Sequence, residues 1–308
     1  MEIIRGIENL EKPFINPVTT LGNFDGIHLG HQRIFQKVFH DARIQKGESV
    51  VITFEPHPLK ILHPERCPPL LTPFEYKMKW IEKAGIDKVL CIEFTKAFSK
   101  IPPHDFIQRI LSKQVGAKKI IVGYNYRFGH GKSGDVASLK GYCTPLGIEV
   151  EVVNALRVDG TIVSSSKIRE LIIQGEVEKA SKLLGRNYSV VGRVIKGNQR
   201  GRALGFPTAN LEITQEVYPK PGVYAVYATW RGQSRNGLAN IGFNPTFEGK
   251  VLTIEVHLLD FNQSIYGDEM EVFFIKRIRN EVKFASIEEL VTQIREDIEW
   301  AKIQIFQS

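Results

Sequence analysis

The chain has 308 residues, of which 43% are hydrophobic, and a formal net charge of +7 at pH 7. This length predicts about two domains, and the apolar fraction is sufficient for packed cores. No run of roughly 18 apolar residues is present, so we expect no membrane span, and residues 1–6 are too polar for a signal peptide. The three cysteines are odd in number and far apart, which favours free thiols in a reducing compartment, the cytoplasm.

The positive charge is confined to the first part of the chain. Residues 1–186 hold 27 Lys and Arg against 20 Asp and Glu, a net charge of +7, whereas residues 187–308 hold 14 of each. A basic half suits a phosphate-bearing ligand or nucleic acid. An ordinary solvated surface explains the charge equally well, so charge alone does not choose between these classes.

In the first part of the chain, apolar runs with strand character alternate with helix-like patterns. This alternation predicts a parallel sheet covered by helices. A short apolar stretch at Val18–Leu21 precedes expected strands at Val50–Phe54, Val89–Phe94, Lys119–Gly123 and Ile148–Val153. Helices are expected at residues 32–45, 73–85, 104–114 and 135–142, and then at Ser166–Gln174 and Val177–Leu184, with Gly175 as a helix stop between the last two.

The pattern changes after Arg186, and we place the domain boundary between residues 186 and 187. Short β-rich runs separated by turn residues then follow, which predicts a small antiparallel barrel or sandwich. An amphipathic helix closes the sequence, with Ser286 as its expected N-cap. The β-rich runs are Tyr188–Ile195, Gly222–Trp230, Ser234–Ile241, Val251–Leu259 and Met270–Ile275.

The most informative segment is residues 22–31, where His28 and His31 are separated by a Leu-Gly pair. A strand, a glycine-bearing turn and a helix start form the place where α/β proteins hold phosphates, because backbone N–H groups and the positive helix end face the ligand. Two imidazoles on this turn can contact a triphosphate and the charge that develops when it is cleaved. For H-x-G-H alone, two incidental turn histidines are the alternative.

This spacing resembles the signature of the nucleotidylyltransferases, and the wider segment Leu21–His28 resembles the start of the prokaryotic bifunctional riboflavin kinase/FAD synthetase family. The resemblance implies an α/β N-terminal Rossmann-like domain at residues 1–186, which acts as FMN adenylyltransferase. It implies a C-terminal antiparallel β-barrel riboflavin kinase domain with a final helix at residues 187–308. In the first domain it assigns catalysis to His28 and His31, and ATP or phosphate binding to Gly22, Asn23, Phe24 and Gly30.

A second basic element is expected in residues 163–169, where three hydroxyls precede a helix with cations in its first turn. One hydroxyl can cap that helix and leave N–H groups for phosphate. The segment resembles the family motif I-S-S-T-R-I-R, with Ser and Lys in place of Thr and the first Arg. Lys lacks the planar fork of Arg, so the resemblance places catalysis on Arg169 and phosphate binding on Ser164, Ser165, Ser166 and Lys167. An ordinary capped helix is the alternative.

Residues 123–129 resemble the family's flavin-side loop, often written G-x-[DN]-F-x-F-G. An amide can hydrogen-bond a ring edge and aromatic rings can pack on a flavin face, so the resemblance implies flavin binding by Asn125, Tyr126 and Phe128. Core packing is the alternative for the aromatic rings. The overlapping Gly129–Gly134 matches G-x-G-x-x-G, but it lies too late in the domain for a dinucleotide fingerprint, and Tyr126 stands where the first Walker glycine must be.

Two further motifs lie in the second half. Residues 205–211 resemble the riboflavin kinase motif, in which Thr208 and Asn210 offer hard oxygen ligands for magnesium with ATP. A turn followed by an edge strand is the alternative for this segment. The preceding loop Gly197–Arg202 resembles a phosphate-covering loop, with Gly201 and Arg202 as ATP contacts. In the strand at residues 251–258, alternation turns Glu255 and His257 away from the aliphatic face. The resemblance assigns the catalytic base, which a kinase needs near the acceptor hydroxyl, to Glu255.

The resemblance spans nearly the whole chain and implies two reactions: riboflavin + ATP → FMN + ADP, then FMN + ATP → FAD + pyrophosphate. It implies Mg²⁺ as cofactor and riboflavin, FMN and ATP as small-molecule substrates, with no nucleic-acid or membrane partner. Two alternatives stay open: a nucleotidylyltransferase of another substrate class, and a non-catalytic flavin- or RNA-binding module. Residues 206–210 oppose the first, and the second leaves the catalytic motifs unexplained. The oligomeric state is not set by the sequence.

Overall fold

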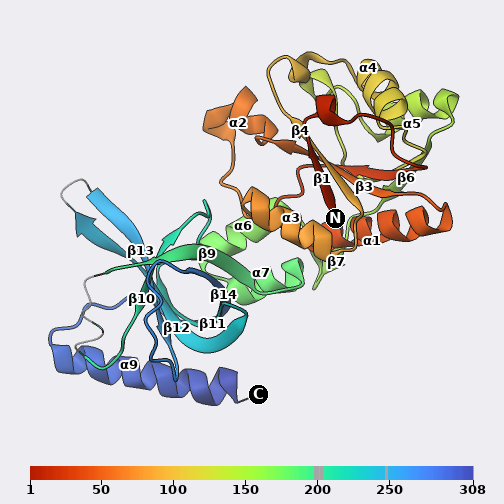
Figure 1. The fold of residues 1–308 in the computed structure, drawn as a ribbon. Helices are drawn as coiled ribbons and strands as arrows, with labels where there is room; N and C mark the ends of the chain where they lie inside the picture. The colour runs from red at the N-terminus through yellow and green to blue at the C-terminus, as the bar shows by residue number, and fades with distance from the viewer. Residues whose placement is uncertain (198–200, 202–203, 247–248, 308) are drawn as a thin grey trace. The chain divides into compact units, whose positions relative to one another are not determined.

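The computed structural model describes residues 1–197, 201, 204–246 and 249–307 (Figure 1). The chain divides into two compact units, Met1–Ser164 and Ser165–Ser308. This division lies earlier in the sequence than the predicted boundary, because helices α6 (Ser165–Gln174) and α7 (Val177–Leu184) pack with the second unit. The division concerns packing alone, so the boundary between the two activities at 186/187 stays a prediction.

The first unit is built on a six-stranded, fully parallel sheet with the order β1-β4-β3-β2-β5-β6, as the alternating pattern predicts. The order runs outward from β2 in both directions, so the carboxyl end of β2 is the switch point where open α/β sheets bind ligands. The strands are β1 (Glu2–Arg5), β2 (Val18–Leu21), β3 (Ser49–Glu55), β4 (Lys88–Glu93), β5 (Lys119–Gly123) and β6 (Glu149–Val153).

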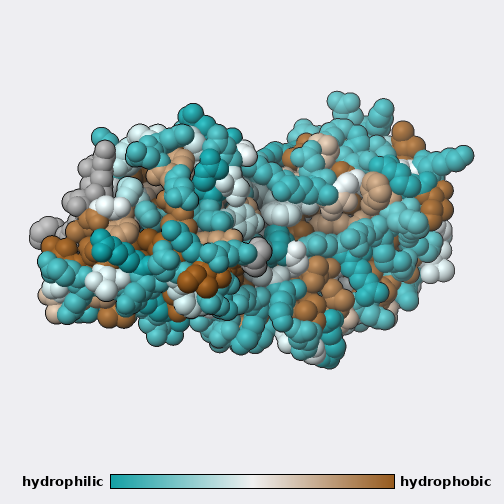
Figure 2. All heavy atoms as spheres, turned by 90° about the horizontal axis from the view of Figure 1, so that it is seen from below, coloured by the Kyte–Doolittle hydropathy of each residue, from teal (hydrophilic) through white to brown (hydrophobic). Residues whose placement is uncertain are grey.

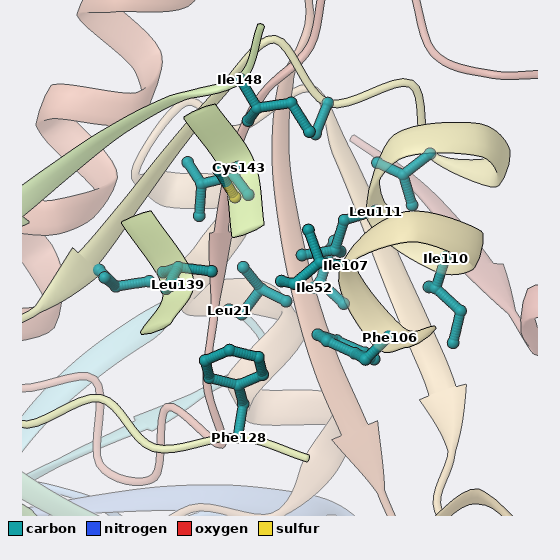
Figure 3. Packing of buried hydrophobic residues seen from close by; sticks show 14 of the residues in the cluster. Leu21, Ile52, Phe106, Ile107, Ile110, Leu111, Phe128, Leu139, Cys143 and Ile148 are labelled. Atoms are coloured by element: carbon teal, nitrogen blue, oxygen red, sulfur yellow. The ribbon is translucent and has the colours of Figure 1, made fainter. Parts of the chain in front are cut away.

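Helices cover both faces of this sheet, because its central strands are apolar on both faces. Successive residues such as Val51 and Ile52 point to opposite sides, and each is fully buried in a separate core cluster. One cluster packs β-strands against α1 (Leu29–Ile44) and α3 (Phe74–Lys83). The other, shown in Figure 3, packs them against the π-helical segment η4 (Phe106–Gln114) and α5 (Val136–Cys143).

Short elements complete the first unit. They are the helices α2 (Pro58–Leu62) and α4 (Pro103–Asp105), the 3-10 turns η1 (Ile7–Asn9), η2 (Pro64–Arg66), η3 (Phe98–Lys100), η5 (His130–Lys132) and η6 (Thr144–Leu146), and the two-stranded ribbon of β7 (Arg157–Val158) and β8 (Thr161–Ile162).

The second unit contains a closed barrel with the order β10-β13-β12-β11-β14-β9. All neighbours are antiparallel, and β9 pairs with β10 to close the barrel. Of the two architectures that the pattern predicts, the barrel is therefore the one formed. The strands are β9 (Tyr188–Ile195), β10 (Ala209–Ile213), β11 (Gly222–Trp230), β12 (Gln233–Thr246), β13 (Gly249–Leu258) and β14 (Glu269–Arg279).

Helix α9 (Ile287–Ala301) packs on the barrel and continues into η7 (Lys302–Phe306). The predicted cap is present, since the Ser286 hydroxyl accepts the Glu289 N–H at 3.2 Å. Arg279 of β14 binds the buried carboxylate of Asp297 through two nitrogens, the closer at 2.8 Å. This ion pair ties α9 to the barrel wall.

Hydrophilic side chains predominate on the face drawn in Figure 2, and apolar groups form scattered patches between them. Within the described ranges, no helix combines the length and apolar character that a membrane crossing requires.

Candidate active site

The H-x-G-H turn lies at the carboxyl end of β2 and leads into α1, as predicted. His28 is the N-cap of α1, and its Nδ1 accepts the backbone N–H of His31 at 3.3 Å. Because Nδ1 accepts, the proton of a neutral His28 ring resides on Nε2. The two imidazoles stack with their centroids 3.6 Å apart. The cap thus presents a ring N–H donor at the helix end where phosphates bind.

Glycines make this arrangement possible. A Cβ on Gly30 would lie 3.2 Å from the His28 ring, which is tighter than ordinary van der Waals contact. A Cβ on Gly22 would similarly meet the ring of Phe24 at 3.0 Å. Phe24 in turn packs edge-on against His31 at 5.2 Å between centroids. The predicted phosphate-binding residues therefore include two glycines that let the rings fold onto the turn.

One side chain and two backbone N–H groups from later in the chain hold the turn in place. Asn23 contacts His57 Nε2 at 3.0 Å, and the carboxylate of Asp25 accepts the N–H groups of Leu71 and Thr72 at 2.9–3.1 Å. His57 also caps α2 through its Nδ1.

Lys77 of α3 is a further buried contact of the turn that sequence patterns did not single out. Its ammonium donates to the carbonyl of Asn23 and to the hydroxyl of Thr53, each at 3.4 Å. The side chain is only 7% exposed, and burial lowers its pKa against the opposing charges of Glu55 and Asp25. Its charge is thus enclosed beside the carboxyl ends of β2 and β3.

The predicted flavin-side loop follows β5, the neighbour of β2, at the same edge of the sheet. Asn125 is exposed there. Tyr126 stacks on Phe128 with 5.6 Å between centroids, and burial raises the pKa of the Tyr126 phenol. Phe128 is 6% exposed and belongs to the core cluster of Figure 3. Only Asn125 of these three therefore has an exposed side chain.

The overlapping glycine-rich segment is a closed turn. Phe128 and Gly134 exchange two backbone hydrogen bonds at 3.0–3.1 Å, and η5 lies between them. A Cβ on Gly134 would press on the Phe128 ring at 2.7 Å. Gly134 therefore serves loop packing, consistent with rejecting a Walker or dinucleotide motif here.

The second basic motif begins α6. The helix starts at Ser165, so Ser164 stands at the N-cap position and Ser166 lies in the first turn. Lys167 donates to Glu170 at 2.9 Å within the same helix, and Arg169 follows as a partly exposed residue. The hydroxyls and cations thus gather at one helix N-terminus, an arrangement that favours anions.

In the barrel, three of the predicted kinase residues, Thr208, Asn210 and Glu255, come together where β10 begins to pair with β13. Asn210 lies opposite Glu255 in the register of these strands, and the Thr208 hydroxyl lies 3.5 Å from a carboxylate oxygen of Glu255. Ile254, Val256 and Leu258 are buried, whereas Glu255 and His257 are partly exposed. This confirms the predicted alternation along β13.

The glycines of the preceding loop lie against these residues. A Cβ on Gly197 would collide with the side-chain amide of Asn210, and one on Gly201 with the carbonyl of Phe206. The N–H of Phe206 donates to the carbonyl of Gly201 at 2.8 Å. Close backbone approach therefore explains both glycines, whereas Arg202, a predicted ATP contact, lies outside the described residues.

The parallel sheet carries, at its switch point, a turn suited to binding phosphate. The barrel carries a carboxylate that lies beside a hydroxyl and opposite an amide. Together these two features are typical of a nucleotide-dependent transferase with two sites. The family model for FAD synthetase matches residues 11–167, and that for riboflavin kinase matches residues 184–305. The chain belongs to the family of bifunctional riboflavin kinases/FMN adenylyltransferases. It phosphorylates riboflavin to FMN and adenylylates FMN to FAD. This excludes both alternatives that the sequence left open, a nucleotidylyltransferase of another substrate class and a non-catalytic binding module.

Relatives match along almost their entire length. The bifunctional riboflavin kinase/FMN adenylyltransferase of Buchnera aphidicola subsp. Schizaphis graminum is 39% identical over 306 residues, with 98% of each chain covered. That of Escherichia coli K12 is 37% identical over 299 residues, with 96% of each covered. A solved structure described as a macrolide-efflux protein from Streptococcus pneumoniae shares 33% identity and a TM-score of 0.90, covering 98% of this chain and 99% of that chain.

Proposed function

We propose that adenylyl transfer takes place at the turn that carries His28 and His31, and phosphoryl transfer on the face of β13 that carries Glu255. The carrying observation for the first site is the stacked, helix-capping histidine pair at the switch point of the sheet. For the second it is the gathering of Thr208, Asn210 and Glu255. We place the boundary between the two domains at residues 186/187.

At the first site, a phosphate oxygen of FMN attacks the α-phosphorus of ATP, and the bond to pyrophosphate breaks. Negative charge grows on the triphosphate oxygens, so donors placed there lower the barrier. His28, His31 and Arg169 take this role. ATP is bound by Gly22, Asn23, Phe24, Gly30, Ser164, Ser165, Ser166 and Lys167. The flavin is bound by the loop of Asn125, Tyr126 and Phe128, in which Asn125 offers the exposed side chain and the ring of Phe128 is buried.

At the second site, the 5′-hydroxyl oxygen of riboflavin attacks the γ-phosphorus of ATP and ADP leaves. Glu255 accepts the hydroxyl proton, as a general base must. Gly201 and Arg202 contact the ATP phosphates from the preceding loop. The two products are thus FMN and ADP, and FMN is the acceptor at the first site.

ATP-using enzymes of these two kinds generally need a divalent metal, and we propose Mg²⁺ held by Thr208 and Asn210. The donor set fits, because hydroxyl and amide oxygens are hard ligands and Mg²⁺ commonly combines one or two protein ligands with phosphate oxygens and water. When bound, the ion neutralises charge on the transferring phosphates.

We further propose that the enzyme works in the cytoplasm on riboflavin, FMN and ATP as small-molecule substrates. Its three cysteines form no disulfide with one another, and two of them are buried, which suits a reducing compartment.

A direct experiment tests the two activities and their requirement for a divalent metal. The protein is incubated with riboflavin, ATP and Mg²⁺, and the flavins are separated by chromatography. We expect FMN to appear first and FAD to follow, with neither formed when Mg²⁺ is chelated. Formation of neither flavin in the complete mixture would refute the assignment.

A further inference from the structure

We propose that His257 is a positioning residue for phosphoryl transfer. Its ring holds the segment Phe206–Thr208, and with it the Thr208 hydroxyl, beside the base Glu255. The inference rests on the proposed roles of Thr208 and Glu255, and it goes beyond them because it assigns a role to a side chain that contacts neither reacting group.

The contact itself is short and specific. His257 Nδ1 lies 2.9 Å from the carbonyl oxygen of Pro207, and the His257 ring packs edge-on against Phe206 with 5.8 Å between centroids. A carbonyl oxygen only accepts hydrogen bonds, so Nδ1 must carry a proton. His257 therefore donates to Pro207, and this bond fixes its ring tautomer.

The segment needs such a contact because strand pairing starts too late to hold it. Pairing of β10 with β13 begins at Ala209 opposite Val256. Pro207 has no N–H and so cannot donate to a ladder. The His257 ring supplies a hydrogen bond to the backbone at the point where the ladder does not.

His257 lies on the same strand as the base Glu255, so it can fix where Thr208 lies relative to that base. Glu255 and His257 are two residues apart on β13 and therefore share one face of the strand. The Glu255 carboxylate lies 3.5 Å from the Thr208 hydroxyl, and the His257 ring binds the carbonyl of the preceding residue, Pro207. A single rigid strand thus sets the spacing between base and hydroxyl from two points.

Packing on the other side of the segment completes the clamp. Phe206 packs against the cluster formed by Leu238, Ala225, Ile298 and Ala301, which joins the barrel wall to α9. Leu238 is also the cross-strand partner of His257. The partly buried Phe206 ring therefore packs against both His257 and this cluster, and the carbonyl of Pro207 lies within reach of the imidazole.

Two substitutions separate the hydrogen bond from the ring packing. His257→Phe keeps an aromatic ring against Phe206 but removes the donor, whereas His257→Asn keeps an N–H donor near the Nδ1 position and removes the ring. In steady-state riboflavin kinase assays, we expect His257→Phe to raise the KM for MgATP about five- to tenfold, the size of one lost hydrogen bond. The KM for riboflavin stays within about twofold, and His257→Asn restores the MgATP value to within about threefold.

Internal controls identify a merely structural effect. FAD formation from supplied FMN should be unchanged in both variants. Trp230→Phe is a control at the last residue of β11. It removes another side-chain hydrogen bond of the barrel, from the Trp230 ring N–H to Asp268 at 2.7 Å. It should leave the KM for MgATP unchanged. Failure of His257→Asn to restore the KM, or an equal rise for riboflavin, overturns the proposal.

Thr208→Ala distinguishes this proposal from the one on which it rests. If Thr208→Ala leaves the Mg²⁺ and ATP dependence unchanged, the assigned metal ligand is wrong and the role of His257 is refuted with it. If Thr208→Ala raises the requirement for Mg²⁺ but His257→Phe does not alter the KM for MgATP, the metal assignment stands and the positioning role of His257 is refuted.

Discussion

Asn210 and Glu255 lie directly opposite each other in the antiparallel pair of β10 and β13. On the other side of the same row, Asn240 of β12 is the partner of Glu255. Because cross-strand partners project from one face, the carboxylate stands between two amides on the barrel wall. The row therefore places a carboxylate, which can accept a proton, between two amides. Each amide offers a carbonyl oxygen and an NH₂ group that donates hydrogen bonds.

Replacing Glu255 by Gln is therefore expected to stop FMN formation without disturbing the fold. Gln keeps the size and hydrogen-bonding ability of the side chain but cannot accept the riboflavin proton, so the kinase rate should fall by about 10²- to 10⁴-fold. Chromatography of flavins after incubation with riboflavin gives the measurement. FAD should still form from supplied FMN, and loss of both activities in a folded variant would contradict two separate sites.

His28 should show the reverse pattern, with FMN accumulating from riboflavin and no FAD following. Because His28 also caps α1, His28→Ala combines a stability loss of about 0.5–2 kcal/mol with the loss of a phosphate donor. His28→Asn separates the two effects, since Asn retains a cap acceptor but lacks the imidazole donor. We expect both variants to lower the FAD-forming rate about 10²- to 10³-fold and only the Ala variant to unfold at lower temperature. A fully active Asn variant would assign the histidine to capping alone.

Gly30 gives a sharper test, because activity and stability should separate. Ala is the better helix former by about 0.5–1 kcal/mol, so Gly30→Ala should not destabilise α1. Its methyl group, however, would press on the His28 ring at 3.2 Å. A shift of a few tenths of an ångström in a donor should lower FAD formation about tenfold.

Gly141→Ala is the matched control for this substitution. Gly141 lies in α5 with no atom within 4 Å of an added Cβ, so the variant should be at least as stable as the parent and fully active in FAD formation. Unchanged FAD formation in Gly30→Ala, or an equal loss of FAD formation in both variants, would contradict the idea that Gly30 acts by leaving room for the His28 ring.

The sequence predicted the elements whose own pattern is strong. The bounds of β5, α7, β9 and β11 agree with those expected from periodicity alone. It did not predict β1, β7 or β8, and it offered a strand at β10 only as an alternative. Strands β1 and β10 are short and owe their form to distant partners, β4 in one case and β9 and β13 in the other. It also ended β12 too early, at Ile241, because Asn244 and Pro245 are typical of turns, although the strand continues to Thr246.

The site residues show the same difference between local pattern and distant contacts. The turn that carries His28 was predicted from local spacing. For Glu255, local alternation predicted only its face of the strand, and its role as base came from the family resemblance. Contacts between residues far apart in sequence were not predicted, since Lys77 reaches Asn23 across 54 positions and His257 reaches Pro207 across 50. A pattern within one element carries no signal for such pairs. Local pattern also left two interpretations of Phe128 open, flavin binding and core packing, and only the fold shows that its ring lies in the core.

Asp87, at the amino end of β4, provides a pH-dependent test of the first unit. Its carboxylate accepts the N–H and hydroxyl of Ser49 at 2.9 and 2.7 Å and a bond from Arg43 at 2.7 Å. Burial alone would raise the pKa of Asp87, but these bonds outweigh it and hold the pKa below the ordinary value of 3.8. A depressed folded-state pKa means that the ionised group stabilises the fold above the ordinary value, and that this contribution is lost as pH falls through the folded value.

We therefore expect Asp87→Asn to lower the free energy of unfolding at pH 7 by about 1–3 kcal/mol, and the gap to the parent to close below about pH 4. Unfolding in urea is followed by the fluorescence of Trp80 on α3, with Trp230 and Trp300 replaced by Phe in parent and variants alike. Glu75→Gln is the control, because the Arg5–Glu75 pair is 60% and 72% exposed and such pairs contribute about 0–1 kcal/mol. A gap of the same size at pH 3 and pH 7 would show that the charge of Asp87 does not stabilise this unit.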